Sequence, residues 1–133
     1  MPADRTIRIA LWCSVALNFF GLLVFGSGAI GRPSPLLAVP IAPFYAAQLT
    51  LTIGLFGAAY AWLALQPTID VPLLVFGAVG KIAFFSLFVL FWVLGDLTWQ
   101  TAAQTSPDLL LGLVYLWWVR WGTKRPVTSR PRP

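Results

Sequence analysis

Four apolar segments divide the chain, and short polar or proline-rich stretches separate them. The third segment, residues 71–94, is apolar for its whole length except for Lys81 and Ser86. About 20 apolar residues, at a helical rise of about 1.5 Å per residue, cross the hydrocarbon core of a bilayer. The pattern therefore predicts that this segment is a membrane-spanning helix.

The remaining apolar segments predict three more spanning helices, at about residues 7–25, 44–65 and 107–121. Pro67 ends the second helix after Gln66, because the residue before a proline disfavours the helical conformation. The linker that follows is so short that we expect the second and third helices to form an antiparallel hairpin. Asp70 is expected to cap the third helix, and residues 98–105 to form a short interfacial helix. The predicted fold is all-α, an antiparallel bundle of four transmembrane helices.

The composition agrees with a membrane protein. Of 133 residues, 59% are hydrophobic and only 10% are charged, whereas soluble domains carry about 25% charged residues. The length suits a single domain over residues 1–122. The basic, proline-rich tail, residues 123–133, is expected to be disordered.

The distribution of basic residues predicts the orientation. With four spans both termini lie on one side, and that side holds all but two of the nine Lys and Arg residues: Arg5, Arg8, Arg120, Lys124, Arg125, Arg130 and Arg132. Arg32 alone lies on the other side. Because positive charge marks the cytoplasmic side, we expect cytoplasmic termini and a multi-pass protein of the bacterial inner membrane. The four basic residues of the tail are candidates for contact with anionic lipid headgroups.

Lys81 is the main candidate for chemistry, since an ammonium group within a membrane normally faces a partner or a wet cavity. Measured along the helices from the cytoplasmic ends, Asn18 lies level with Lys81, and Asp108 is only marginally reachable. Lysine side chains lean toward the N-terminus of their helix, which weakens the expected pairing with Asp108. Three interpretations stay open: a structural lysine satisfied within the bundle, a site for an anionic headgroup or small anion, and snorkelling to the interface without a partner.

The residue inventory argues against catalysis. The chain has no histidine and no glutamate, and its four aspartates form no pair at helical spacing. A general base, a metal site and a haem or quinone-type redox centre therefore lack the side chains that they need. Cys13 is the only cysteine, which excludes an intrachain disulfide. We expect no catalytic residue, no metal and no cofactor, and we do not expect nucleic-acid binding.

The sequence resembles a set of small bacterial inner-membrane proteins with four transmembrane helices. The residues that carry the resemblance are Phe56 to Ala64, Gln66-Pro67, Ile69-Asp70, Pro72, Gly80-Lys81, Asp108-Leu109, Asn18 and Trp117-Trp118. The resemblance covers most of the chain except its tail. It implies the fold and directs attention to Lys81, Asn18 and Asp108, and it implies no reaction.

Small and polar residues recur at helical spacing on three of the segments, and such stripes let helices pack closely in a membrane. They are Thr50, Gly54, Ala58 and Ala61; Ser14, Asn18 and Gly21; and Asp108, Gly112 and Tyr115. The pattern favours a non-enzymatic membrane protein that assembles with itself or with a membrane partner. The alternative is a carrier or binder of an anionic or lipid-like ligand, anchored by Lys81 with Asn18 and Asp108 beside it.

Overall fold

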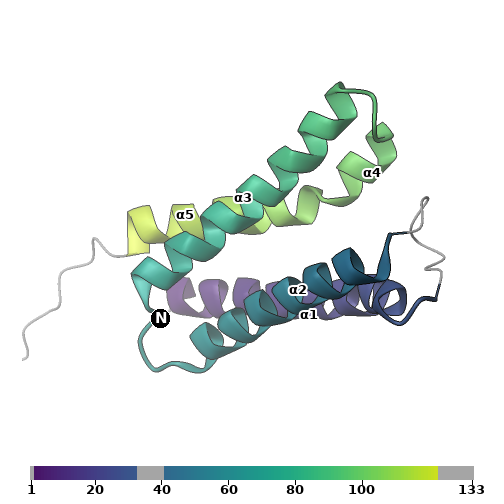
Figure 1. Cartoon of the computed structure of the whole chain (residues 1–133). Coiled ribbons are helices and arrows are strands. Elements are labelled where there is room, and N and C mark those ends of the chain that lie inside the picture. The colour runs from purple at the N-terminus through teal and green to yellow at the C-terminus, as the bar shows by residue number, and fades with distance from the viewer. Residues whose placement is uncertain (1, 33–40, 123–133) are drawn as a thin grey trace, which may run out of the picture.

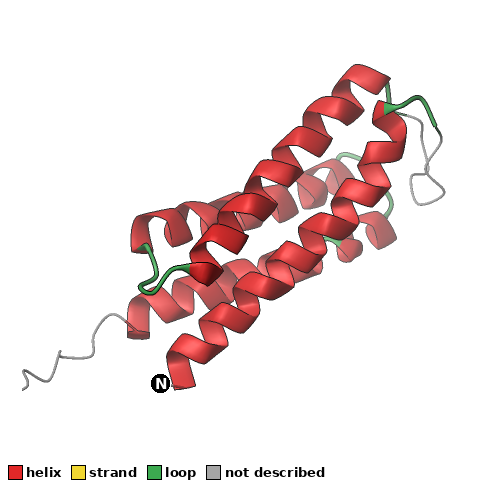
Figure 2. Ribbon diagram, turned by 90° about the horizontal axis from the view of Figure 1, so that it is seen from below, coloured by secondary structure: helices red, strands yellow, loops and turns green. Residues whose placement is uncertain are grey.

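The computed structural model describes residues 2–32 and 41–122. Five helices make up this part of the chain (Figure 1): α1 (Pro2–Ala29), α2 (Pro43–Leu65), α3 (Val71–Val93), α4 (Trp99–Gln104) and α5 (Ser106–Gly122). Within the described residues the remaining segments are loops and turns, and no strand occurs (Figure 2). The prediction of an all-α fold is confirmed.

The ends of α3 and α4 follow from local capping. The Asp70 side chain accepts a hydrogen bond from the backbone N–H of Leu73 at 3.0 Å, so the predicted cap of α3 is confirmed. Thr98 caps the short helix α4 in the same way, by accepting from Thr101 N–H at 3.3 Å. Both caps satisfy backbone donors that a helix N-terminus leaves without an intrahelical partner. Between the two helices, Gly95 adopts a φ of 90°, a conformation that favours glycine.

The first helix is longer at both ends than the predicted 7–25. At its start Asp4 lies in the first turn, where a carboxylate interacts favourably with the helix dipole. At its end the Ser27 hydroxyl donates to the carbonyl of Val24 at 3.0 Å, so this serine stays within the helix. The prediction was too short because it counted only apolar residues, whereas the helix continues through polar ones.

The helices pack as two pairs. α1 lies against α2 along their length, and α3 lies against α5, while α2 and α3 have little contact with each other. Figure 1 shows the two pairs close together at the end that holds the N-terminus of α1 and the C-terminus of α5, and diverging toward α4. We expected the second and third helices to pack on each other as a hairpin. Instead, α2 packs mainly on α1, and α3 packs mainly on α5.

Glycines allow the close approaches within each pair. A Cβ placed on Gly112 of α5 would lie 3.1 Å from the Ala78 carbonyl oxygen and 2.9 Å from Ile82 Cγ1 of α3. Between α1 and α2, a Cβ on Gly28 would lie 3.0 Å from the Cβ of Ala46. Gly112, which lies on a predicted stripe, is thus occupied by a contact between helices of the same chain.

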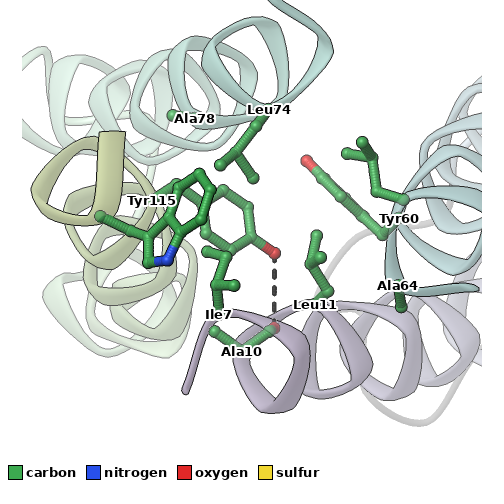
Figure 3. Close-up of a cluster of buried hydrophobic side chains, with 10 residues drawn as sticks. Ile7, Ala10, Leu11, Tyr60, Ala64, Leu74, Ala78 and Tyr115 are labelled. Carbon is green, nitrogen blue, oxygen red and sulfur yellow. Dashed lines mark hydrogen bonds between the residues drawn. The ribbon is translucent and has the colours of Figure 1, made fainter. Parts of the chain in front are cut away.

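A compact core joins the two pairs at their closed end (Figure 3). Tyr60 of α2 and Tyr115 of α5 point into it, with ring centroids 5.9 Å apart. Leu11 of α1 and Leu74 of α3 pack beside these rings and are completely buried. All four long helices therefore contribute to one core, which lies nearer the chain termini than the opposite end.

Most large apolar side chains outside this core are exposed, including Phe19, Leu55, Phe76 and Leu110, each more than 60% exposed. So extensive an apolar surface is typical of helices that face lipid. α1 from Asp4, α2 and α3 are each long and apolar enough to cross a membrane. The chain is therefore a helical protein with three candidate membrane-spanning helices, and α5, with 17 residues, is shorter than these.

Candidate functional site

Lys81 and Asp108 form an ion pair between α3 and α5. The Lys81 Nζ atom lies 2.6 Å from Asp108 Oδ1. The two side chains are 3% and 15% exposed, so the pair is largely withdrawn from the surface. Of the three interpretations of Lys81, snorkelling without a partner is wrong.

The packing of α3 on α5 brings the two charges to the same level. Gly112 lies against Ala78 and Ile82, and Asp108 is one turn earlier on the antiparallel helix, beside Lys81. Asp108 also lies in the first turn of α5, where the helix dipole favours a carboxylate. Counting residues along the helices does not give the register between α3 and α5. The prediction that Asp108 is only marginally reachable from Lys81 was therefore too pessimistic.

Tyr60 of α2 is a third member of the site, and the sequence analysis did not select it. Its ring centroid lies 5.0 Å from Lys81 Nζ, within the range of a cation–π interaction. Its hydroxyl donates to the carbonyl of Gly77 at 3.2 Å, and the ring fits against α3 because Gly77 has no side chain. One feature of the sequence could have identified Tyr60: it is a large aromatic residue with a hydroxyl group among small residues, Gly57, Ala58, Ala59 and Ala61.

Asn18 of α1 lies on the same cavity as Lys81 and Asp108. Its Cβ packs on Gly57 of α2, at 3.2 Å from the position that a glycine Cβ would take. The Nδ2 atom is buried and has no hydrogen-bond partner among the residues that the structure describes. Asn18 therefore lines the same cavity as the ion pair, and its amide retains unused donors.

The cavity lies between the two helix pairs and has a volume of about 510 Å³. Lys81, Asp108, Asn18 and Tyr60 line it, and we call these four residues the floor. Five phenylalanines provide much of its wall: Phe20, Phe25, Phe56, Phe84 and Phe88. Polar side chains of α2 and of the α4 region also line it: Thr52, Thr101, Gln104 and Thr105.

The position of α5 explains why this space is open. α5 begins at Ser106, and its first turn already faces Lys81 in the middle of α3. Beside the C-terminal half of α3, the described part of the chain supplies the six-residue helix α4. A helix of that length does not fill the space that a full spanning helix would occupy, so the walls there stay apart.

The closed core lies on the other side of the floor. Tyr115 and Ser14 share a hydrogen bond of 2.5 Å between their hydroxyls. The Tyr115 hydroxyl also lies 3.3 Å from the carbonyl oxygen of Ala10, to which it can donate (Figure 3). These contacts tie α5 to α1.

Arg8 is a structural residue whose contacts were not predicted. Its guanidinium donates to the carbonyls of Ala64 and Pro67 at 2.5 and 3.1 Å. These carbonyls lie at the C-terminal end of α2, where a cation is favourable. The sequence interpretation assigned Arg8 only to orientation. The candidate lipid contacts Lys124, Arg125, Arg130 and Arg132 lie outside the described residues.

Within residues 2–32 and 41–122, no group of three or more His, Cys, Asp or Glu side chains could hold a metal ion. The site offers an ion pair, an amide and a tyrosine, with phenylalanines around them. Comparison with protein-family models, curated proteins and solved structures finds no match to this chain.

Proposed function

We propose that this protein binds a lipid-like ligand in the cavity between its two helix pairs. The observation that carries the proposal is a cavity of about 510 Å³ with Lys81 and Asp108 on its floor and phenylalanines in its wall. Ligand sites in proteins are mostly apolar concavities with a few convergent polar groups. An amphiphile matches this division, with its polar group at the floor and its apolar part along the wall.

The alternative, assembly through small-residue stripes, has less support. Gly57, Gly77 and Gly112 contact Asn18, Tyr60 and α3 of the same chain. Residues already used in this way are not available for another helix. Binding therefore accounts for more of the structure than assembly does.

The proposal places the protein in the bacterial inner membrane, with α5 as a fourth, short span and both termini cytoplasmic. The exposed Trp62, Trp117 and Trp121 lie on the helix halves nearest the termini, and the exposed Trp92 and Trp99 lie near the opposite end. Tryptophan is enriched at both membrane interfaces, which supports four crossings. In this orientation the cavity lies in the half of the protein away from the cytoplasm. The proposed role is binding or carrying rather than catalysis.

Filling the cavity with a protein side chain tests the proposal. Thr52 of α2 lines the cavity, and we expect Thr52→Trp to exclude a bound lipid. The purified full chain, in a mild detergent, is examined by native mass spectrometry for co-purifying lipid. We expect wild type to retain a lipid adduct and Thr52→Trp to lose most of it.

Leu51→Trp is the matched control, because Leu51 is the neighbouring residue and faces away from the cavity, 64% exposed. This variant should retain the adduct. Equal adducts in all three proteins would place any lipid on the outer surface and would refute the proposal, as would a wild-type protein free of lipid that binds none when lipid is added.

A further inference from the structure

We infer that the polar group of the ligand is uncharged and is a hydrogen-bond acceptor of the carbonyl type. The inference rests on the proposed function and specifies the class of lipid that the cavity selects. It follows from the charge balance of the floor and from the donors that the floor leaves unused.

The lining of the cavity carries no net charge. Its charged side chains are Lys81 and Asp108, which neutralise each other across 2.6 Å. A phosphate or carboxylate brought to Lys81 would also approach the Asp108 carboxylate. The repulsion from the carboxylate offsets much of the attraction to the Lys81 ammonium, and the anion would still lose its hydration on entering the cavity. An anionic headgroup is therefore disfavoured, even though the floor contains a lysine.

The floor has a surplus of donors. Asn18 Nδ2 carries two N–H groups and has no partner among the described residues, although it is buried. Lys81 carries three N–H groups, and Asp108 Oδ1 accepts one of them. A buried donor without an acceptor is unfavourable, so an acceptor at this place is favourable. A carbonyl oxygen supplies acceptor lone pairs without adding charge.

The apolar part of the ligand is also constrained. Several phenylalanine rings face the cavity, including the adjacent pair Phe84 and Phe88 with centroids 4.9 Å apart. Such walls accept apolar chains and flat rings without offering further hydrogen bonds. Two kinds of membrane lipid combine an uncharged carbonyl with a long apolar chain: an alkyl or prenyl quinone and a diacylglycerol.

Three probes separate these possibilities from an anionic ligand: a decyl-substituted benzoquinone, dioctanoylglycerol and dioctanoyl phosphatidic acid. The last two differ only by the phosphate. Each probe is titrated into the purified full chain, and the dissociation constant is obtained from the rise in thermal unfolding temperature. We expect at least one neutral probe to bind, and dioctanoylglycerol or the quinone to bind at least about tenfold more tightly than the phosphatidic acid.

Asn18→Leu should weaken binding of the preferred neutral probe about tenfold, because it removes the unpaired donor and keeps a similar volume. Gln48→Leu, which removes an exposed amide on α2 that does not line the cavity, should leave the dissociation constant unchanged. The comparison of probes on wild type alone tests the inference if Asn18→Leu does not fold.

Tighter binding of phosphatidic acid than of both neutral probes would overturn the inference and leave the proposed function intact. An unchanged dissociation constant in folded Asn18→Leu would likewise overturn the role of the amide. A chain that binds none of the three probes, and that carries no native lipid, would instead refute the proposed function itself. The ratio of the dissociation constants of the quinone and dioctanoylglycerol shows which of the two kinds of lipid supplies the carbonyl.

Discussion

The two ends of this small protein share α1, α2 and α3 and have opposite interiors. At the closed end, Leu11, Leu74 and Tyr115 are completely buried, and side chains from four helices fill the centre. At the diverging end, phenylalanines and a buried ion pair surround a cavity of about 510 Å³. The difference lies in what the described residues supply opposite α3: α5 along its first half, and the short α4 beyond it.

This contrast shows how a membrane protein can form a pocket without giving up a packed core. The tyrosines of the closed end fill space and form hydrogen bonds between helices, such as that of Tyr115 with Ser14. In a bilayer such contacts matter, because lipid tails are as apolar as the side chains and burial of apolar area contributes little to helix association. The floor marks the boundary between the two regions.

The largest expected effect comes from breaking the ion pair at that boundary. Lys81→Met leaves Asp108 unpaired in an apolar environment, and removal of one partner of a buried pair costs about 3–5 kcal/mol. Asp108→Leu in the same chain removes the orphaned charge, so the double variant should recover most of the lost stability. Reversible unfolding in mixed micelles with an anionic detergent gives the free energies. Equal losses in the single and double variants would show that Lys81 stabilises the fold by packing alone.

A second comparison truncates one side chain at each end. Leu74→Ala opens a void in the closed core and should cost about 2–5 kcal/mol. Phe84→Ala removes more atoms but only enlarges an existing cavity, so we expect the free energy of unfolding to fall by less than about 1 kcal/mol. The free energies of unfolding of both variants are measured in the same mixed micelles. A larger loss for Phe84→Ala than for Leu74→Ala would mean that the diverging pairs depend on the wall as much as on the core.

The third and smallest effect concerns the approach of α3 and α5, which positions the floor. Gly112→Ala introduces a Cβ 3.1 Å from the Ala78 carbonyl oxygen and should destabilise by about 1–3 kcal/mol, within the range found for overpacking. Gly54→Ala is its control, because the new Cβ meets only Leu22 Cδ2 at 3.5 Å. There the higher helix propensity of alanine should raise stability, by up to about 1 kcal/mol. A loss of the same size at both positions would argue that close packing at Gly112 is not needed.

Local features of the sequence predict the helices. Apolar run length predicted α2, α3 and α5 to within about one residue, and Asp70 identified the start of α3, since these features depend only on neighbouring residues. Run length failed at the ends of α1, where polar residues continue the helix. The sequence also selected Lys81, Asn18 and Asp108, because polar groups in an apolar run are costly wherever they lie.

How these residues meet depends on the packing of the helices. Depth along a helix axis can be counted, but the rotation of each helix and the angle between pairs cannot. Those depend on contacts between distant residues, such as Gly112 with Ala78 and Tyr60 with Gly77. They bring Asp108 to Lys81, add Tyr60 to the floor and leave the amide of Asn18 without a partner among the described residues. The cavity also depends on tertiary packing. It is the space that the short helix α4 leaves unfilled between the two helix pairs, and the separation of those pairs cannot be predicted from any one segment.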